Sequence, residues 1–234
     1  MPLASPGVEL VLVRHGLPVR VDAVDGGGPA DPELSARGRE QAARVTGALL
    51  HDHVDAVYSS PARRARETAA PLASALGLPV AVEPGIAEFD SADGSYVPVE
   101  ELRAEGDPRW HALARGDLYS PDVDPDAFRA RVVGAVHRIA AAHPGGRAVL
   151  FTHAGACNAL LGDVLGVQRP LWYAPAYCSV QRVAVSRAGR RGVVSLNETG
   201  HVRDLLDVAV PRRDGIDLSG LQVPPRSHES PGDV

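Results

Sequence analysis

The sequence is poor in cysteine and aromatic residues, and it has no long apolar run. Two cysteines occur among 234 residues, Cys157 and Cys178, and they form neither a Cys-x-x-Cys pair nor a disulfide framework. This usage excludes the disulfide-rich secreted class and fits a reducing compartment. No stretch approaches the roughly 20 apolar residues that a membrane-spanning helix needs, and the first dozen residues lack the basic region of a signal peptide. We therefore expect a cytoplasmic enzyme or binding domain without a membrane segment.

The chain also lacks the charge pattern of a nucleic-acid-binding protein. Its formal net charge is −5, and it has no basic run and no alternation of basic with aromatic residues. Arginine supplies the positive charge, and its rigid fork of donors suits phosphate and carboxylate, although a genome-wide preference for arginine would give the same count. The apolar fraction of 44% and charged fraction of 23% are those of an ordinary globular protein. One domain can bury a sizeable core at this length.

Alternating strand and helix patterns predict an α/β fold. Residues 8–13 form an apolar run that is typical of a strand buried on both faces. Further strands are predicted at 55–60, 79–84 and 147–153, with a hairpin at 178–186 and 192–197. Helices are predicted over 36–50 with Ser35 as N-cap, and from Ser60-Pro61 to Gly77 with Ser60 as the capping residue and a kink near Pro71. Two more are predicted over 124–143, opened by Asp124-Pro125, and over 154–166. This order predicts a three-layer α/β/α sandwich with a mostly parallel sheet and an antiparallel edge strand.

The chain divides into one predicted domain and a tail. Residues 1–210 are predicted to form the domain, with a cap-like insertion at about 83–123 that carries short helical pieces. Residues 211–234 are rich in Pro, Gly and charge and have little to bury, so we predict a disordered tail. No feature of the sequence specifies an oligomeric state.

Charged and imidazole side chains follow four of the predicted strands. They are Arg14 and His15, then Arg64, then Glu88, and last His153. Because the carboxyl ends of strands in a doubly wound sheet open on one crevice, we expect these side chains to converge. Arginine forks bind phosphate oxygens bidentately, and a positive field stabilises the charge of phosphoryl transfer. The amino terminus of the helix after His153 would add backbone N–H donors, with Ala154 the nearest.

These residues stand in motifs that resemble a known family. The motifs, in chain order, are "RHG" at 14–16, "LSARGREQA" at 34–42, "YSSPARRARETA" at 58–69, "AEFD" at 87–90, "FTHAG" at 151–155 and "LNETGHV" at 196–202. In this order they resemble the histidine phosphatase superfamily, which includes phosphoglycerate mutases and many small phosphatases. Ser60, Ala65 and Thr68 match the family pattern around its arginine, which selects Arg64 over Arg63.

The resemblance implies a role for each of these side chains. His15 would be the nucleophile that accepts the phosphoryl group as phosphohistidine, and Arg14, Arg64 and His153 would clamp the phosphate. Glu88 would protonate the leaving oxygen and then activate water, an exchange of acid and base roles that a two-step transfer needs. The family needs no metal or other cofactor for this chemistry, and no metal-ligand spacing is visible in the sequence.

Two segments depart from the family pattern. Many members follow the glutamate with a glycine-and-tryptophan segment, whereas "FDSADGSY" stands here, so Asp90 remains the alternative to Glu88 as the acid. Many members also carry a hydroxyl or asparagine after "RHG" that touches the phosphate. Leu17-Pro18 stands there in this chain. That contact is either lost or supplied by another group such as Arg20.

Three functions compete on this sequence. The favoured one is a phosphomonoesterase of the phosphatase branch, acting on a small phosphate ester that the sequence does not identify. The alternative is a mutase, which returns the phosphoryl group to its substrate, but residues 83–123 hold five glutamates that would repel a bisphosphorylated sugar acid. The third is a non-catalytic phosphate-recognising domain, which is disfavoured because the nucleophile and all clamp residues are present.

Overall fold

The computed structural model describes residues 7–23, 27–120 and 122–206, and the predicted tail at 211–234 lies outside the described residues. Within the described residues six strands form one sheet in the order β3-β2-β4-β1-β5-β6. The strands are β1 (Val8–Arg14), β2 (Ala56–Ser59), β3 (Val80–Val82), β4 (Arg147–Thr152), β5 (Val180–Val185) and β6 (Arg191–Glu198). The first four are mutually parallel, and β5 pairs antiparallel with both β1 and β6. The predicted mostly parallel sheet with an antiparallel edge is therefore confirmed, and the predicted hairpin forms that edge.

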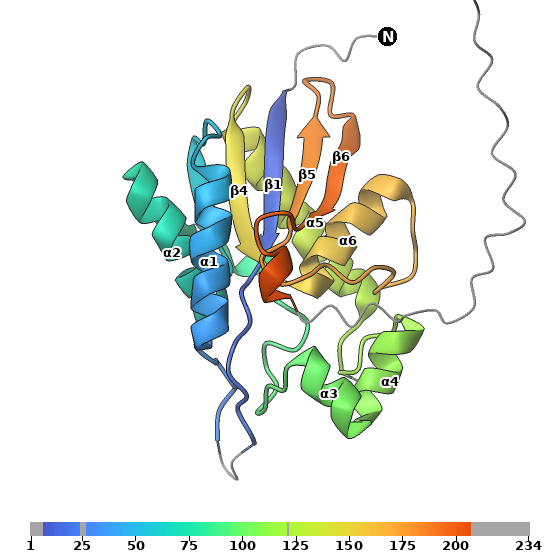
Figure 1. The fold of residues 1–234 in the computed structure, drawn as a ribbon. Helices are drawn as coiled ribbons and strands as arrows, with labels where there is room; N and C mark the ends of the chain where they lie inside the picture. The colour runs from blue at the N-terminus through green and yellow to red at the C-terminus, as the bar shows by residue number, and fades with distance from the viewer. Residues whose placement is uncertain (1–6, 24–26, 121, 207–234) are drawn as a thin grey trace, which may run out of the picture.

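Helices cover both faces of the sheet and extend past one of its ends. They are α1 (Ala36–Leu49), α2 (Arg63–Leu76), α3 (Val99–Glu105), α4 (Pro108–Arg115), α5 (Pro125–Ala142) and α6 (Ala154–Leu165), with 3₁₀ turns η1 (Pro84–Ile86) and η2 (Arg203–Leu205). Figure 1 shows α1 and α2 on one side of the sheet and α5 and α6 on the other, the predicted three-layer sandwich. The short helices α3 and α4 lie beyond the ends of β1 and β4. No helix among the described residues is long and apolar enough to cross a membrane.

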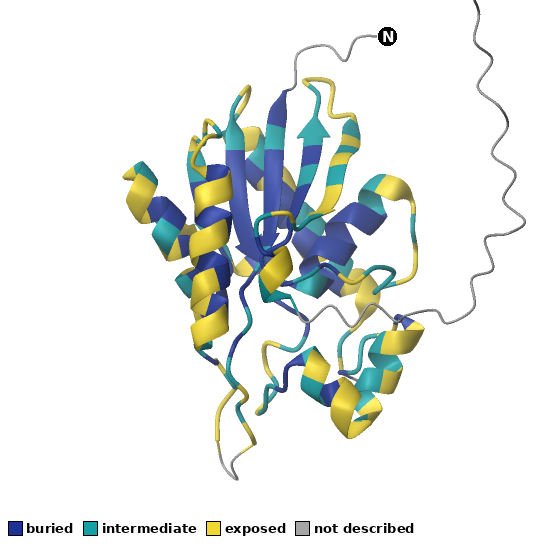
Figure 2. Cartoon of the chain, viewed as in Figure 1, coloured by how far each residue is buried: buried dark blue, intermediate teal, exposed yellow. Residues whose placement is uncertain are grey.

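Strand β1 is the centre of the hydrophobic core. Its side chains alternate between the two faces, so Leu10 and Leu12 pack with α5 and α6 while Val11 and Val13 pack with α1 and α2. Each fully buried Val or Leu contributes about 1.5–3 kcal/mol relative to an exposed one. In Figure 2 the central strands are buried along their length, whereas β6 alternates between partly buried and exposed residues. This packing gives the end of β1 a rigid position.

Of the four predicted helix starts, those of α1, α5 and α6 are confirmed and that of α2 is wrong. Ser35 caps α1, since its hydroxyl accepts from the backbone N–H of Gly38, and Asp124 caps α5 in the same way. Ser60 was expected to cap the second helix, but α2 begins at Arg63 and its N-cap residue makes no side-chain cap bond. The Ser60 hydroxyl is instead hydrogen-bonded to His153. Helix α2 continues through Pro71.

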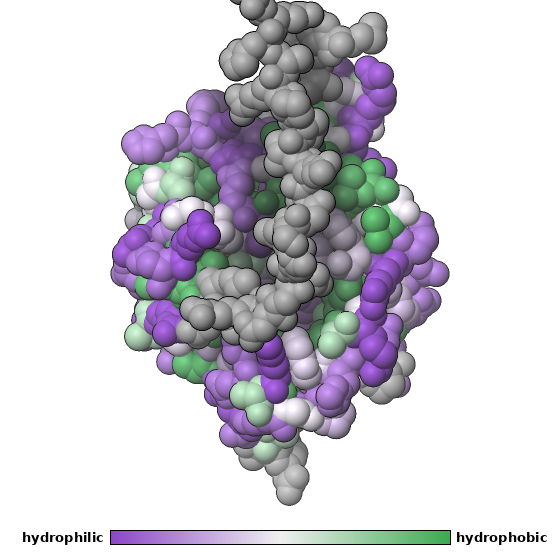
Figure 3. Space-filling model, turned by 45° about the vertical axis from the view of Figure 1, so that its right-hand side comes forward, coloured by the Kyte–Doolittle hydropathy of each residue, from purple (hydrophilic) through white to green (hydrophobic). Residues whose placement is uncertain are grey.

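Hydrophilic and hydrophobic residues are mixed on the outer surface. On the face shown in Figure 3, hydrophilic residues prevail at both margins, and hydrophobic residues appear in small groups between them. Such scattered apolar groups are normal on a protein surface and indicate no function by themselves.

Candidate active site

The carboxyl ends of β1, β2 and β4 open into a cavity of about 400 Å³. Four of the residues selected from the sequence line it together: Arg14, His15, Arg64 and Glu88. The fifth, His153, is fully buried behind them, and its ring lies 5.1 Å from the His15 ring between centroids. The register explains the pairing of the histidines, because Arg14 at the end of β1 stands beside Thr152 at the end of β4. The residue that follows each strand is a histidine, His15 after β1 and His153 after β4.

His15 is buried and held as one tautomer. Its Nδ1 lies 2.8 Å from the carbonyl oxygen of Gly16, which accepts only, so Nδ1 carries the proton and Nε2 keeps its lone pair. Burial, followed by the charges of Arg64 and Arg14, holds the pKa of His15 well below its usual value. The ring is therefore neutral at physiological pH. Arg64 Nε donates to His15 Nε2 at 3.4 Å.

The loop after His15 packs tightly against α1. A Cβ on Gly38 would lie 2.0 Å from the carbonyl oxygen of Leu17, and a Cβ on Gly16 would lie 2.6 Å from the carbonyl oxygen of Gly38. Both glycines are needed for this close approach of two backbones. The N–H of Gly16 donates to Thr68 Oγ1 at 3.0 Å, which ties the loop to α2.

Two arginines flank His15, and each lies over an aromatic ring. The Arg14 guanidinium carbon lies 3.7 Å from the centroid of the Tyr177 ring, and that of Arg64 lies 4.7 Å from the centroid of Tyr96. Such stacking orients a guanidinium while leaving its edge N–H groups for hydrogen bonds. Arg14 Nε is buried and makes no hydrogen bond within the described residues. The result is a concentration of positive charge around a neutral imidazole, which suits an anion.

His153 is also held as one tautomer, by Ser60. The Ser60 hydroxyl oxygen accepts from the N–H of Ala62 at 3.2 Å and lies 2.7 Å from His153 Nε2. Among the described residues Nε2 is the one acceptor within reach of the hydroxyl proton, so the hydroxyl donates to Nε2 and the imidazole proton is on Nδ1. Nδ1 is buried and has no partner among the described residues. Burial, with the charge of Arg64 and the neighbouring His15, lowers the pKa of His153 well below its usual value.

Glu88 is a buried carboxyl group held by two backbone donors. Its Oε2 accepts from the N–H of Gly155 at 2.8 Å, and its Oε1 from the N–H of Phe89 at 3.1 Å. Burial, followed by the charge of Asp90, raises the pKa of Glu88 to about 7. The helix terminus after His153 was expected to offer backbone N–H donors to an anion, with Ala154 the nearest. Ala154 lines the cavity, whereas the N–H of Gly155 is occupied by Glu88. A Cβ on Gly155 would lie 2.2 Å from Glu88 Oε1, so this contact requires glycine.

Asp90, the alternative acid, lies in the same cavity with other partners. Its Oδ2 accepts from the hydroxyl of Tyr119, and its Oδ1 lies 3.8 Å from Arg64 Nη2. Asp90 pairs with Arg64 and Tyr119, whereas Glu88 is the carboxyl group whose pKa burial raises to about 7.

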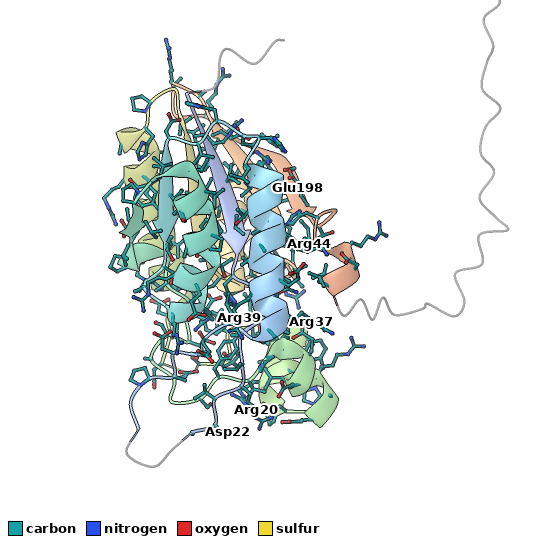
Figure 4. All side chains as sticks on the ribbon, turned by 60° about the vertical axis from the view of Figure 1, so that its left-hand side comes forward. Arg20, Asp22, Arg37, Arg39, Arg44 and Glu198 are labelled. Atoms are coloured by element: carbon teal, nitrogen blue, oxygen red, sulfur yellow. The ribbon has the colours of Figure 1, made fainter. Side chains whose placement is uncertain are left out.

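Leu17 and Pro18, which stand after "RHG" in this chain, place no polar group in the cavity. The N–H of Leu17 donates to Gln41 Oε1 at 2.9 Å, and its carbonyl accepts from both the N–H and the hydroxyl of Ser35. Arg20 does not supply the contact, and that alternative is wrong. It is an exposed residue paired with Asp22 and with two glutamates of α3. Figure 4 shows Arg20 and Asp22 together below α1, away from the sheet.

Sequence reasoning missed the residues that hold the arginines and the cavity wall. Tyr96 and Tyr177 belong to no motif. The one signal in the sequence that could have pointed to them is that aromatic residues are scarce in this chain. Asn158 fixes the wall: its Nδ2 donates to the carbonyls of Ala154 and Tyr173, at 2.9 and 2.8 Å. Its Oδ1 accepts from the N–H groups of Trp172 and Tyr173, so the side chain of Asn158 is fully used.

Comparison with known proteins identifies the family. The family model of the histidine phosphatase superfamily (branch 1) matches residues 10–199. The chain belongs to this superfamily. It is 29% identical over 199 residues to phosphoserine phosphatase 1 of Hydrogenobacter thermophilus, covering 83% of this chain and 94% of the relative. It is 30% identical over 165 residues to the metal-independent phosphoserine phosphatase of Arabidopsis thaliana, covering 67% of this chain and 68% of the relative.

A solved structure shows the same fold. A mycobacterial glucosyl-3-phosphoglycerate phosphatase superposes with a TM-score of 0.66 at 23% identity, covering 81% of this chain and 98% of the other. Family membership and the two phosphoserine phosphatase relatives show that the chain is a phosphatase.

Proposed function

We propose that this phosphatase is a metal-independent phosphomonoester hydrolase that acts through a phosphohistidine at His15 on a small phosphorylated substrate. The observation that carries the proposal is the state of His15. Its Nδ1 is locked on Gly16, its Nε2 keeps a lone pair that accepts a long hydrogen bond of 3.4 Å from Arg64 Nε, and Arg14 and Arg64 line the cavity with it. A neutral imidazole in a positive field is a nucleophile suited to a phosphate dianion.

In the first step His15 Nε2 attacks phosphorus, and the bond from phosphorus to the ester oxygen breaks. The proton of Glu88 passes to that oxygen, which leaves as an alcohol. Arg14, Arg64 and the Nδ1–H of His153 hold the three remaining phosphate oxygens as charge builds on them. The pKa of Glu88, raised to about 7 by burial and by Asp90, keeps the proton available near neutral pH.

In the second step water attacks the phosphohistidine, and ionised Glu88 takes the proton from the water. The bond from His15 Nε2 to phosphorus breaks, inorganic phosphate leaves, and Glu88 is protonated again. A pKa near the working pH suits a group that is acid in one step and base in the next.

Hydrolysis is favoured over transfer back to the substrate because the described part of the cavity offers no second phosphate site of comparable charge. Among the described lining residues the cations are Arg14 and Arg64 at one end and Arg169 at the exposed rim. We also propose that residues 83–123 act as a cap, since α3 and α4 contribute lining residues. A cytoplasmic location is proposed because both cysteines are buried free thiols.

The test is phosphate release from an aryl phosphate in the presence of a chelator. Turnover is expected to survive the chelator, and His15→Ala is expected to abolish it while the protein unfolds as cooperatively as wild type. Quenching in alkali during turnover should trap a phosphoryl group on wild type only, and this group should be stable in alkali and released by acid. Wild-type rates from His15→Ala, or loss of activity with chelator, would refute the proposal. Conversion of a phosphoglycerate to its isomer without phosphate release would favour the mutase.

A further inference from the structure

The end of the cavity away from His15 is lined mainly by apolar side chains. They come from three separate segments: 97–102, helix α4 and 171–175. Representative members are Val97, Leu102, Trp110, Leu113, Leu171 and Trp172. The apolar character is therefore a property of the assembled cavity and not of one loop.

Few side-chain polar groups remain at this end for a ligand. Asn158 uses all its donors and acceptors on the backbone, and the hydroxyl of Tyr119 is donated to Asp90. Among the described lining residues outside the phosphate site this leaves four groups. They are the buried, unpartnered hydroxyl of Tyr173, the Oδ1 of Asp90 (3.8 Å from Arg64 Nη2 and without a hydrogen bond), the indole N–H of Trp110 and the exposed guanidinium of Arg169. A small polar substrate would leave most of the lining uncovered and find few partners for an amino group or further hydroxyls.

We propose that the substrate class of this phosphatase is a phosphate monoester of a bulky, largely apolar alcohol or phenol. This inference rests on the proposed hydrolysis at His15 and adds the organic half of the substrate to it. A cavity of about 400 Å³ is within the range that holds a drug-sized organic group. The phosphate binds among Arg14, His15 and Arg64, and the organic group lies between α4 and the wall that Asn158 fixes. Removal of its apolar surface from water supplies the binding energy.

The test is a series of n-alkyl phosphates from ethyl to octyl, compared with O-phosphoserine. The leaving oxygen is a primary alkoxide throughout the alkyl series, so the chemical step stays nearly constant while the buried apolar surface grows. We expect kcat/KM to rise by up to about fourfold per methylene until the cavity is filled. O-phosphoserine is expected to fall below butyl phosphate, which is of similar size.

One variant in the cavity and one control variant outside it test whether the dependence of kcat/KM on chain length comes from the cavity. Trp110→Ala removes an apolar wall from α4 and is expected to lower the octyl-to-ethyl ratio of kcat/KM at least tenfold. Val194→Ala changes a residue of β6 that is 59% exposed and lies outside the cavity lining, so its ratio should equal that of wild type. Both variants are checked for wild-type cooperative unfolding before comparison.

Each outcome decides between the two proposals. A flat alkyl series, or O-phosphoserine as the better substrate, would overturn the apolar substrate class while leaving hydrolysis at His15 intact. A rise that persists unchanged in Trp110→Ala would overturn the assignment of the organic group to this end. If no ester, aryl or alkyl, releases phosphate, the proposed hydrolysis itself fails.

Discussion

Replacing Glu88 with glutamine should change the free energy of unfolding in a way that depends on pH, with the variant gaining stability relative to wild type as pH rises. Burial and Asp90 raise the pKa of Glu88 from 4.5 to about 7. Below pH 4.5 the carboxyl group is protonated in both the folded and the unfolded chain, and it costs nothing. Between pH 4.5 and 7 the unfolded chain ionises while the folded one stays protonated, so stability falls as pH rises. Above pH 7 the loss is constant at about 3 kcal/mol, which glutamine avoids because it does not ionise.

Glutamine also introduces a change that does not depend on pH. Glu88 accepts from the N–H groups of Gly155 and Phe89, one on each oxygen. The amide of glutamine can accept on its oxygen only, so one backbone donor loses its partner at a cost of about 1–3 kcal/mol. The net stability at a single pH therefore mixes two opposed effects, and only the difference between pH values isolates the ionisation.

The assay is denaturant unfolding of wild type and Glu88→Gln at pH 4.5, 6 and 8. The variant should gain stability relative to wild type by about 3 kcal/mol between the first and last pH. Glu83→Gln is the matched control, because this glutamate at the start of η1 is part of the same segment but pairs with Arg138 outside the cavity. A difference that does not change with pH would refute the raised pKa of Glu88 and weaken its selection as the acid.

Three other substitutions test the positions of the active-site groups. Ser60→Ala removes the hydrogen bond that fixes the His153 tautomer, so kcat/KM should fall about tenfold in steady-state assays, and the free energy of unfolding should fall by about 1–3 kcal/mol because buried polar groups lose their partner. A wild-type rate would contradict the tautomer assignment. Gly38→Ala places a Cβ 2.0 Å from the Leu17 carbonyl and should lower the free energy of unfolding by about 1–3 kcal/mol, whereas alanine at Gly47, where nothing lies within 4 Å, should not. Asn158→Ala should lower activity and expose the 171–175 segment to faster hydrogen exchange, and unchanged exchange there would refute its role in the wall.

Much of the fold could be predicted from the sequence because its determinants are local. The apolar run of β1 and the buried face of α5 can be read from the spacing of apolar residues over a few positions. The capping residues of α1 and α5 each depend on one hydrogen bond to a nearby backbone N–H. The false cap at Ser60 shows the limit of this reasoning. A serine followed by proline is a helix start by local chemistry, but the buried His153 provides a partner for the hydroxyl that no local pattern reveals.

The sequence by itself determined where the reactive side chains stand along the chain: Arg14-His15 and His153 directly after two buried strands, whose ends must meet in a parallel sheet. Only the tertiary structure decided how these groups are held and what surrounds them. The stacking of the arginines on Tyr96 and Tyr177, the outward direction of Arg20 and the apolar far end of the cavity depend on contacts between distant segments. The physical reason is that side-chain orientation and pKa depend on burial and neighbouring charges, which exist only once those segments have packed together.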